Sequence, residues 1–369
     1  MTVELQGNEA KRKAITQCSR CGFCRAVCPI FELTKRPLTN ARGKMILLRE
    51  IMEGKLPVTE GVAQAFMRCT TCMNCTVTCP SGADPQKAIK EARKEMVGLG
   101  YDNLFKAMGQ VVEKYGNIYG EQDRHDWGHK KEKAPFVLFV GCVGTYREEE
   151  SVDETIRLLD LLKVDFTMTE EVCCSGVLED VGYKIKDDLA QRNIQELRKA
   201  NAASLITVCP YCYRVFTEHP AYKSLGLEVK HITQFLKDFD FGVKTGKKVT
   251  YHDPCDLGRH SGIYDEPREI IRKIAPNFVE PRRTRENALC CGSGGGLRGS
   301  FPEDSVEISR NRLSQIIEET EAEILLTECP SCLHNFRNAK LRKQKIEIYN
   351  ITEFIGQLMQ KKGEKEVVA

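Results

Sequence analysis

The residues best suited to chemistry in this chain are its 18 cysteines, and eight of them stand in two runs of identical spacing. The first run, CSRCGFCRAVCP, holds Cys18, Cys21, Cys24 and Cys28. The second run, CTTCMNCTVTCP, holds Cys69, Cys72, Cys75 and Cys79. Both have the spacing C-x2-C-x2-C-x3-C-P, which is typical of 4Fe–4S cubane sites because three closely spaced thiolates can reach three corners of one cube. Zinc is the weaker interpretation, since it favours two separated CxxC pairs.

The fourth cysteine of each run completes the other site in paired motifs of this ferredoxin type. One cubane is therefore expected on Cys18, Cys21, Cys24 and Cys79. The other is expected on Cys69, Cys72, Cys75 and Cys28.

The remaining ten cysteines form a repeat with no member left over. The first unit contains Cys142, Cys173, Cys174, Cys209 and Cys212. The second unit contains Cys255, Cys290, Cys291, Cys329 and Cys332. Equivalent cysteines are 113 to 120 residues apart. Adjacent cysteines are poor disulfide partners, and five thiolates exceed the four that a tetrahedral zinc ion uses. The pattern of five cysteines therefore predicts a metal-cluster site in each unit.

Glycines follow the second adjacent pair in the stretch ALCCGSGGG, at Gly292, Gly294, Gly295 and Gly296. Glycine accepts positive φ angles, so this loop can bring its backbone close to a cluster and donate N–H groups to sulfur. A flexible loop or a nucleotide-binding loop is the alternative. The spacing fits the dinucleotide fingerprint G-x-G-x-x-G poorly.

The elements that must position these cysteines alternate between strands and helices in the C-terminal two-thirds of the chain. Apolar, β-branched runs at 136–140, 165–168, 204–208, 248–252 and 324–328 predict strands, and helical periodicity appears at 150–163, 186–200, 266–274 and 303–320. This alternation predicts two repeated α/β units with mainly parallel sheets. Four of the cysteines follow a strand, where ligands bind in open parallel sheets.

The N-terminal part has helical periodicity at 43–54 and 84–99, so we expect a mainly α-helical domain that carries the two cubanes. The predicted organisation is this domain at 1–119, a polar linker at 120–135, the first unit at 136–236, a connector at 237–248, the second unit at 249–358 and a frayed tail at 359–369.

The composition excludes several classes of protein. The net charge is only +3, so no general attraction to nucleic acid is expected. The longest apolar run is far shorter than the roughly 20 residues of a membrane span, and the N-terminus lacks a secretory signal. We therefore expect a cytoplasmic chain, without direct membrane insertion, which a partner could hold at the inner face of a membrane. Many cysteines in a reducing compartment indicate metal or redox chemistry.

The order of these motifs resembles the heterodisulfide reductase family, and within it the D-type subunit, from about Cys18 to about His334. The second unit carries the family's Cys-Cys-Gly motif literally, whereas the first has Ser175 in place of the glycine. A further departure is Asp256, which stands where histidine is common in the family.

The resemblance implies that each five-cysteine unit holds a noncubane 4Fe–4S cluster and that the ten cysteines are the catalytic ligands. It implies reduction of a small disulfide, the mixed disulfide of coenzyme M and coenzyme B, in an anaerobic, methanogenic setting. The electron donor would be a membrane cytochrome b-type subunit or a soluble flavoprotein. Two other functions stay open: an iron–sulfur electron-transfer subunit of a glycolate- or lactate-type flavin oxidoreductase, and a metal-structured binding module.

Three further residues have weaker signals. His252 lies near Cys255 in the sequence and is a candidate proton donor, although a packing role is the commoner outcome for such a histidine. Arg259 and Arg298 are candidates for binding sulfonate or phosphate groups, with solvated surface positions as the alternative.

Overall fold

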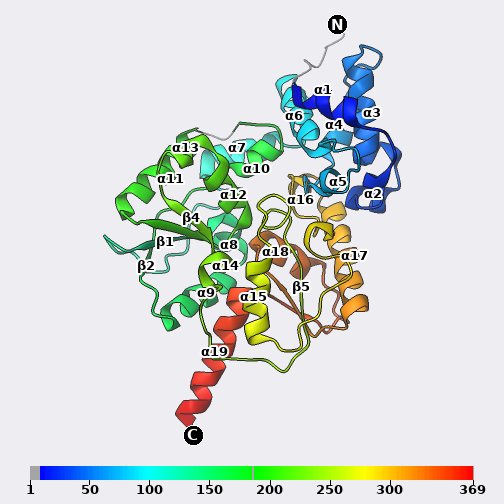
Figure 1. The fold of residues 1–369 in the computed structure, drawn as a ribbon. Helices are drawn as coiled ribbons and strands as arrows, with labels where there is room; N and C mark the ends of the chain where they lie inside the picture. Colours follow the sequence, from blue (N-terminus) through cyan, green and yellow to red (C-terminus); the bar gives the residue numbers. More distant parts are fainter. Residues whose placement is uncertain (1–8, 185–186, 369) are drawn as a thin grey trace.

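The structure is a computed structural model that describes residues 9–184 and 187–368. Figure 1 shows three parts: a helical N-terminal part in blue and cyan, a first α/β unit in green, and a second α/β unit in yellow and orange. This arrangement confirms the predicted fold class.

The N-terminal part packs short helices around one apolar core. Its elements are α1 (Glu9–Gln17), η1 (Phe23–Arg25), α2 (Pro29–Thr34), η2 (Pro37–Thr39), α3 (Ala41–Met52), α4 (Glu60–Met67), α5 (Asn74–Val77) and α6 (Pro85–Gly98). Leu48, Phe66 and Met96 are fully or almost fully buried in this core. The two cysteine runs occupy the irregular stretches around η1 and α5, so the core positions them without enclosing them.

The first unit contains a sheet of four parallel strands in the order β2-β1-β3-β4. The strands are β1 (Phe136–Phe139), β2 (Phe166–Met168), β3 (Ser204–Thr207) and β4 (Glu228–His231). Its helices are α8 (Gly141–Arg147), α9 (Glu149–Leu161), α10 (Gly176–Asp180), α11 (Asp187–Ala200), α12 (Pro210–Glu218), α13 (Pro220–Lys223) and α14 (Ile232–Leu236).

The second unit has parallel strands in the order β5-β6-β7. Its elements are β5 (Val249–Tyr251), α15 (Asp265–Ile274), η3 (Arg285–Asn287), α16 (Leu297–Ser300), α17 (Pro302–Thr320), β6 (Ile324–Thr327), α18 (Pro330–Ala339), β7 (Glu347–Asn350) and α19 (Ile351–Val368). A single parallel bridge joins Val249 to Phe278, where the first unit has β2 beside β1. The two sheets therefore share one topology.

Strands β4 and β7 were not predicted. Both are short, partly exposed strands whose sequences, EVKH and EIYN, mix polar and apolar residues. The signal that could have found them is a second repeat: HITQFL at residues 231–236 corresponds to NITEFI at 350–355. Each copy begins at the last residue of its strand and runs into the following helix, α14 or α19.

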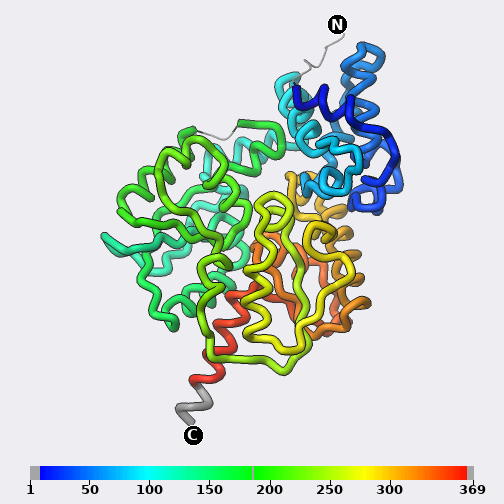
Figure 2. Tube along the Cα trace, in the orientation of Figure 1, coloured from blue at the N-terminus to red at the C-terminus, as the bar shows by residue number. Residues whose placement is uncertain are grey.

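The two units pack on each other through two pairs of helices. Helix α9 of the first unit packs on α19 of the second, and α14 of the first packs on α15 of the second. One apolar cluster spans both sheets and includes Leu138 and Ile206 from the first, and Tyr251 and Leu326 from the second. Figure 2 shows the two units side by side with α19 leaving at the base.

Residues 120–135 contain no helix or strand, but they pack closely against the first unit. The backbone N–H of Met168 donates to the carbonyl of His129 at 2.7 Å. Trp127 donates to Asp153 at 2.8 Å. The preceding helix α7 (Lys106–Tyr115) also packs on this unit, because Val112 shares an apolar cluster with Leu178.

The expectation of a frayed tail at 359–369 was wrong for residues 359–368, which continue helix α19; residue 369 lies outside the described residues. The stretch QKKGEKE at 360–366 has good helix formers (Gln, Lys and Glu) on both sides of Gly363, and these favour continuation of the helix. Within the described part of the chain, no helix has the length and apolar character required to cross a bilayer.

Candidate metal centres

Two cavities in the N-terminal part are lined by cysteine quartets. The first is lined by Cys18, Cys21, Cys24 and Cys79. The second is lined by Cys28, Cys69, Cys72 and Cys75. These are the two sets that crossed pairing of the motifs predicts. Cys75 also lines the first cavity, so the two sites are immediate neighbours.

The two cysteine runs follow the same unusual backbone path. Arg20 and Thr71 have φ of 58° and 53°, and two residues later Gly22 and Met73 have φ of 92° and 66°. A left-handed residue other than glycine costs free energy, so two such residues at one motif indicate a conformation that the site requires. The matched turns bend each run around its cavity.

The first α/β unit gathers its five cysteines into one connected group. The Cys173 thiol contacts those of Cys142 and Cys174. The Cys212 thiol contacts that of Cys209 and lies 3.6 Å from the sulfur of Cys174. Three distant chain segments therefore meet at the carboxyl ends of β1 and β3.

The second unit repeats this arrangement. The Cys290 thiol contacts those of Cys255 and Cys291. The Cys332 thiol contacts that of Cys329, and its sulfur lies 3.1 Å from the sulfur of Cys291. All 18 cysteines are free thiols rather than disulfides.

Two N–H groups and two helix ends favour negative charge at these groups of thiols. The N–H of Ser175 donates to the sulfur of Cys173 at 3.4 Å, and that of Gly292 donates to the sulfur of Cys290 at 3.3 Å. Cys209 and Cys329 are the N-caps of α12 and α18, where the helix dipole is positive. Hydrogen bonds from Cys290 and Cys332 lower the pKa of Cys291 to about 5.

Burial has the opposite effect, both in the two units, where it contributes to the raised pKa of Cys173, Cys212, Cys255 and Cys332, and in the N-terminal part. It raises the pKa of Cys24 and of Cys28 to about 11. These thiols are therefore protonated in the metal-free chain at neutral pH, and metal binding must release their protons.

His252 lies beside the second group of thiols. One of its ring nitrogens and the sulfurs of Cys291 and Cys332 are all within 4.8 Å of one another. Burial lowers the pKa of His252 to about 3, so the imidazole is neutral in the metal-free chain. A neutral imidazole in this place is suited to ligation or packing more than to proton donation.

The glycine loop serves a packing purpose that sequence reasoning missed. A Cβ atom on Gly295 would lie 2.3 Å from the carbonyl oxygen of Cys69, and one on Gly294 would lie 2.8 Å from that of Thr70. Gly292, Gly295 and Gly296 have positive φ, whereas Gly294 does not. The loop therefore lets the second unit approach the backbone of the second cysteine run.

Arg259 lies where the N-terminal part meets the second unit. Its side chain is 8% exposed and donates to the carbonyl oxygens of Cys72 at 2.7 Å and Ala288 at 2.5 Å. The alternative of a solvated surface position was therefore wrong. The thiols of Cys72 and Cys290 lie close enough at the same place for each to influence the other, so a cysteine of the N-terminal part neighbours one of the second unit.

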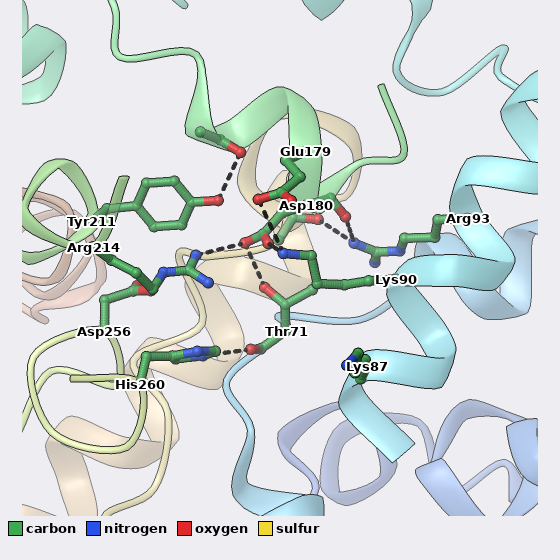
Figure 3. Close-up of polar contacts among 12 residues, drawn as sticks. Thr71, Lys87, Lys90, Arg93, Glu179, Asp180, Tyr211, Arg214, Asp256 and His260 are labelled. Carbon is green, nitrogen blue, oxygen red and sulfur yellow. Dashed lines mark hydrogen bonds and ion pairs between the residues drawn. The ribbon is translucent and has the colours of Figure 1, made fainter. Parts of the chain in front are cut away.

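Asp180 is the centre of a buried polar network in which all three parts of the molecule meet (Figure 3). Lys90 pairs with it at 3.0 Å, and the hydroxyl of Thr71 donates to it at 2.9 Å. Arg214 lies 3.7 Å from Asp180 and 3.2 Å from Asp256. Asp256, the departure from the family pattern, thus takes part in an ion pair between the units.

Arg298 lies near a thiol of the second unit and a carboxylate of the first. Its guanidinium interacts electrostatically with Tyr119, Glu148 and Cys291, and Tyr119 interacts in turn with Cys142. Among the described residues, none forms a hydrogen bond or an ion pair with Arg298. Burial lowers the pKa of its guanidinium. Charged and polar groups from both units therefore surround a partly buried, unpaired cation.

Comparison with protein-family models identifies three matches in this chain. Residues 14–83 match the 4Fe-4S dicluster domain, and residues 136–217 and 249–337 each match the cysteine-rich CCG domain. The matched residues contain all four groups of cysteines. The chain is therefore an iron–sulfur protein.

Curated relatives cover nearly the whole chain. The D-type subunit of dihydromethanophenazine:CoB--CoM heterodisulfide reductase from Methanosarcina barkeri is 31% identical, over 93% of this chain and 93% of the relative. EtfAB:quinone oxidoreductase of Syntrophomonas wolfei is 23% identical, over 94% of this chain and 58% of the relative. The crystal structure of a hypothetical protein from Helicobacter pylori has the same fold, with a TM-score of 0.58 and 10% identity, over 96% of this chain and 73% of that chain.

Proposed function

The chain belongs to the heterodisulfide reductase family, among its D-type subunits, and on that premise we propose that it reduces a small disulfide to two thiols with electrons from a partner protein. The proposed cofactors are two cubane 4Fe–4S clusters in the N-terminal part and one noncubane 4Fe–4S cluster in each α/β unit. The ligands are the two quartets and the two groups of five cysteines described above. The observation that carries the proposal is the gathering of all ten repeat cysteines into two matched groups.

The charges around the cysteines fit such clusters. The cations of Lys44, Arg93 and Arg259 are buried, and among the described residues none has a carboxylate within ion-pair distance. A buried cation without an opposite charge is costly. Thiolate-bound iron–sulfur clusters carry negative charge and would balance these cations.

Scission of a disulfide consumes two electrons and two protons and yields two thiols, and iron–sulfur clusters supply electrons one at a time. Two groups of thiols, one on each side of the substrate, match this electron count. We place the disulfide between the units, near Arg298. Its unpaired guanidinium would hold an anionic group of the substrate by charge-assisted hydrogen bonds.

The partner would deliver electrons at the first quartet. Cys21 is exposed, and the adjacent Phe23 is 61% exposed although it is apolar. From Cys21 the cysteines continue through Cys75, which lines both cavities, and Cys72, which neighbours Cys290. This series provides a path from the surface to the second unit.

The proposal is tested with the anaerobically purified holoprotein, a reduced viologen as electron donor and a disulfide that carries a sulfonate group. We expect two thiols to form for each disulfide consumed. Cys332→Ser should remove about four iron atoms and abolish thiol formation, because one cluster loses a ligand. Full activity in a Cys332→Ser protein that has lost this iron would refute the proposal.

A second function, electron transfer without a disulfide substrate, is favoured by the similarity to EtfAB:quinone oxidoreductase. The resemblance to glycolate- or lactate-type systems points to the same class. Iron analysis separates the two functions: about sixteen iron atoms per chain support disulfide reduction and about twelve support a conduit with one incomplete unit. Paramagnetic resonance of the oxidised protein with added thiol is a sharper test, because only a substrate-binding cluster gives a thiol-dependent signal.

A further inference from the structure

A cavity of about 420 Å³ lies between α2 of the N-terminal part and α17 of the second unit. It is lined by Cys28 and Pro29 on one side and by Arg283, Cys290 and Arg312 on the other. This volume falls within the range of small-molecule sites. The cavity is separate from the region around Arg298. Apart from Cys28 and Cys290, the residues that line it have no role in the proposed disulfide reduction.

Two guanidinium groups line this cavity, and among the described residues no carboxylate lies within ion-pair distance of either. Glu319 and Asp253 act on Arg312 only from a greater distance. Arg312 is 2% exposed; its guanidinium donates to the carbonyl of Arg283 and to the side-chain oxygen of Gln315, both at 2.8 Å, and its Nε has no hydrogen-bond partner. Arg283 donates to the carbonyl of Ala26 at 3.3 Å. Every one of these acceptors is neutral.

Glu32 is the acidic residue that lines the cavity, and it does little to balance the positive charges of Arg283 and Arg312. Glu32 is exposed and pairs with Lys35 at 2.7 Å. The side-chain amide of Asn311 adds a further donor to the wall, whereas the amide of Gln315 already donates to Glu319 at 3.2 Å. Two guanidinium groups and one amide around a cavity form a set of donors suited to an oxyanion.

We propose that this cavity, which we call the Arg283–Arg312 pocket, binds the oxyanion group of a small molecule: a sulfonate, a phosphate or a carboxylate. Because Cys28 and Cys290 border the pocket, the bound anion lies beside two of the sites to which we assign clusters. The proposal does not depend on disulfide reduction by this chain.

An anion in this place has a redox consequence. Reduction adds negative charge beside the bound anion, so binding should make reduction less favourable and lower the reduction potential. Linkage requires the reciprocal effect, namely that reduced protein binds the anion more weakly than oxidised protein by the same factor.

The test is isothermal titration calorimetry of the holoprotein with sulfate, phosphate or acetate, at ionic strength held constant with chloride. The protein is oxidised or is reduced electrochemically, because dithionite would add sulfur oxyanions. We expect saturable binding of at least one oxyanion, weaker in the reduced protein. The order of affinity identifies the preferred group.

Arg283→Gln should weaken binding about tenfold, since it removes a charge-assisted donor. The matched control is Arg282→Gln, which removes the same charge from an exposed side chain that does not line the pocket. Binding to Arg282→Gln protein should stay within about twofold of the parent value, because exposed charges are screened by salt.

Arg312→Gln is a second variant, used where iron content shows that the protein has folded with its clusters. Absence of saturable binding, equal weakening by Arg282→Gln and Arg283→Gln, or equal affinity in both redox states would overturn the proposal. These measurements detect anion binding alone, so a negative result would not count against disulfide reduction by this chain. In the same way, a protein that forms no thiols could still bind an anion in the Arg283–Arg312 pocket.

Discussion

At the scale of single residues, matched left-handed positions shape the sites of both units. Ser175 has φ of 63° and Gly292 has φ of 88°, and each follows an adjacent cysteine pair and donates its N–H to the first cysteine of that pair. The first unit thus retains the required conformation without glycine, at a cost of about 1 kcal/mol for a left-handed serine. The departure from the Cys-Cys-Gly motif leaves the geometry of the loop unchanged.

A side chain should be tolerated much less well at position 292 than at position 175. A Cβ at Gly292 would lie 2.7 Å from the carbonyl oxygen of Ser305, which is backbone and cannot move easily. We expect Gly292→Ser to lower the melting temperature of the holoprotein and to reduce its iron content. Ser175→Gly is the reverse change at the matched position and should alter the stability by less than about 1 kcal/mol, because relief of the left-handed serine is offset by the greater freedom of glycine in the unfolded chain. Equal effects of the two variants would contradict this account of the loop.

At the scale of elements, η1 and α5 present the first quartet to solvent. They pack on one another and carry Phe23, which is 61% exposed, and Val77, which is 40% exposed. Arg20 is exposed on the same cavity wall as Phe23. An apolar face with basic residues suits a partner whose own face is apolar and acidic.

Phe23→Ser should therefore slow electron uptake from an acidic redox protein such as a reduced flavodoxin, and Arg20→Glu should slow it further. Leu161→Ser is the matched control, because Leu161 is 47% exposed on α9, a helix of the first α/β unit that packs on α19. Stopped-flow absorbance measures the rate. Reduced viologen needs no docking surface and should reduce all variants equally. A Leu161→Ser defect as large as that of Phe23→Ser would argue against this docking face.

At the scale of the whole molecule, the network around Asp180 holds the three parts together. Although burial opposes it, the positive charges of Arg214 and Lys90 hold the pKa of Asp180 below its ordinary value. Arg93 of the N-terminal part donates one hydrogen bond to each unit. Its acceptors are the backbone carbonyl of Asp180 in the first unit, at 2.6 Å, and that of Gly295 in the second, at 3.1 Å. The cysteine groups meet only if these parts dock, so the network supports the approach of Cys72 to Cys290.

Asp180→Asn should destabilise the protein by less than the cost of a fully broken buried pair, about 3–5 kcal/mol, but by more than about 1 kcal/mol. Arg214 and Lys90 lose their shared buried counter-charge, but Arg214 keeps Asp256 and Lys90 keeps Glu179. The control is Asp126→Asn in an exposed pair with Lys130, where the expected effect is below about 1 kcal/mol. Thermal unfolding and limited proteolysis measure both.

The pH dependence has a defined sign. A carboxylate whose pKa is depressed on folding contributes stability that is present above its unfolded pKa and is lost as pH falls through the folded value. The difference in stability between parent and Asp180→Asn protein should therefore be constant from about pH 6 to about pH 9. A difference that shrinks within this range would show that Asp180 is not held as a paired carboxylate.

The sequence alone was enough to predict the local features. Cysteine spacing predicted the quartets that line two cavities, and the repeat of five cysteines, together with apolar periodicity, predicted two α/β units. These features depend on residues close together in the chain or on a pattern that is copied, so they are visible without coordinates. The copied segment HITQFL and NITEFI was visible as well, and it marks the matching positions at which β4 and β7 end and α14 and α19 begin.

Only the tertiary structure placed the cysteine groups relative to one another. The proximity of Cys72 to Cys290, the burial of Arg259 and Arg312, and the role of Gly294 and Gly295 all arise where the N-terminal part docks on the second unit. An arginine or a glycine has the same local pattern whether it faces solvent or a neighbouring domain. Its role is decided by which distant surface packs against it, and that depends on the combined burial of many residues rather than on spacing along the chain.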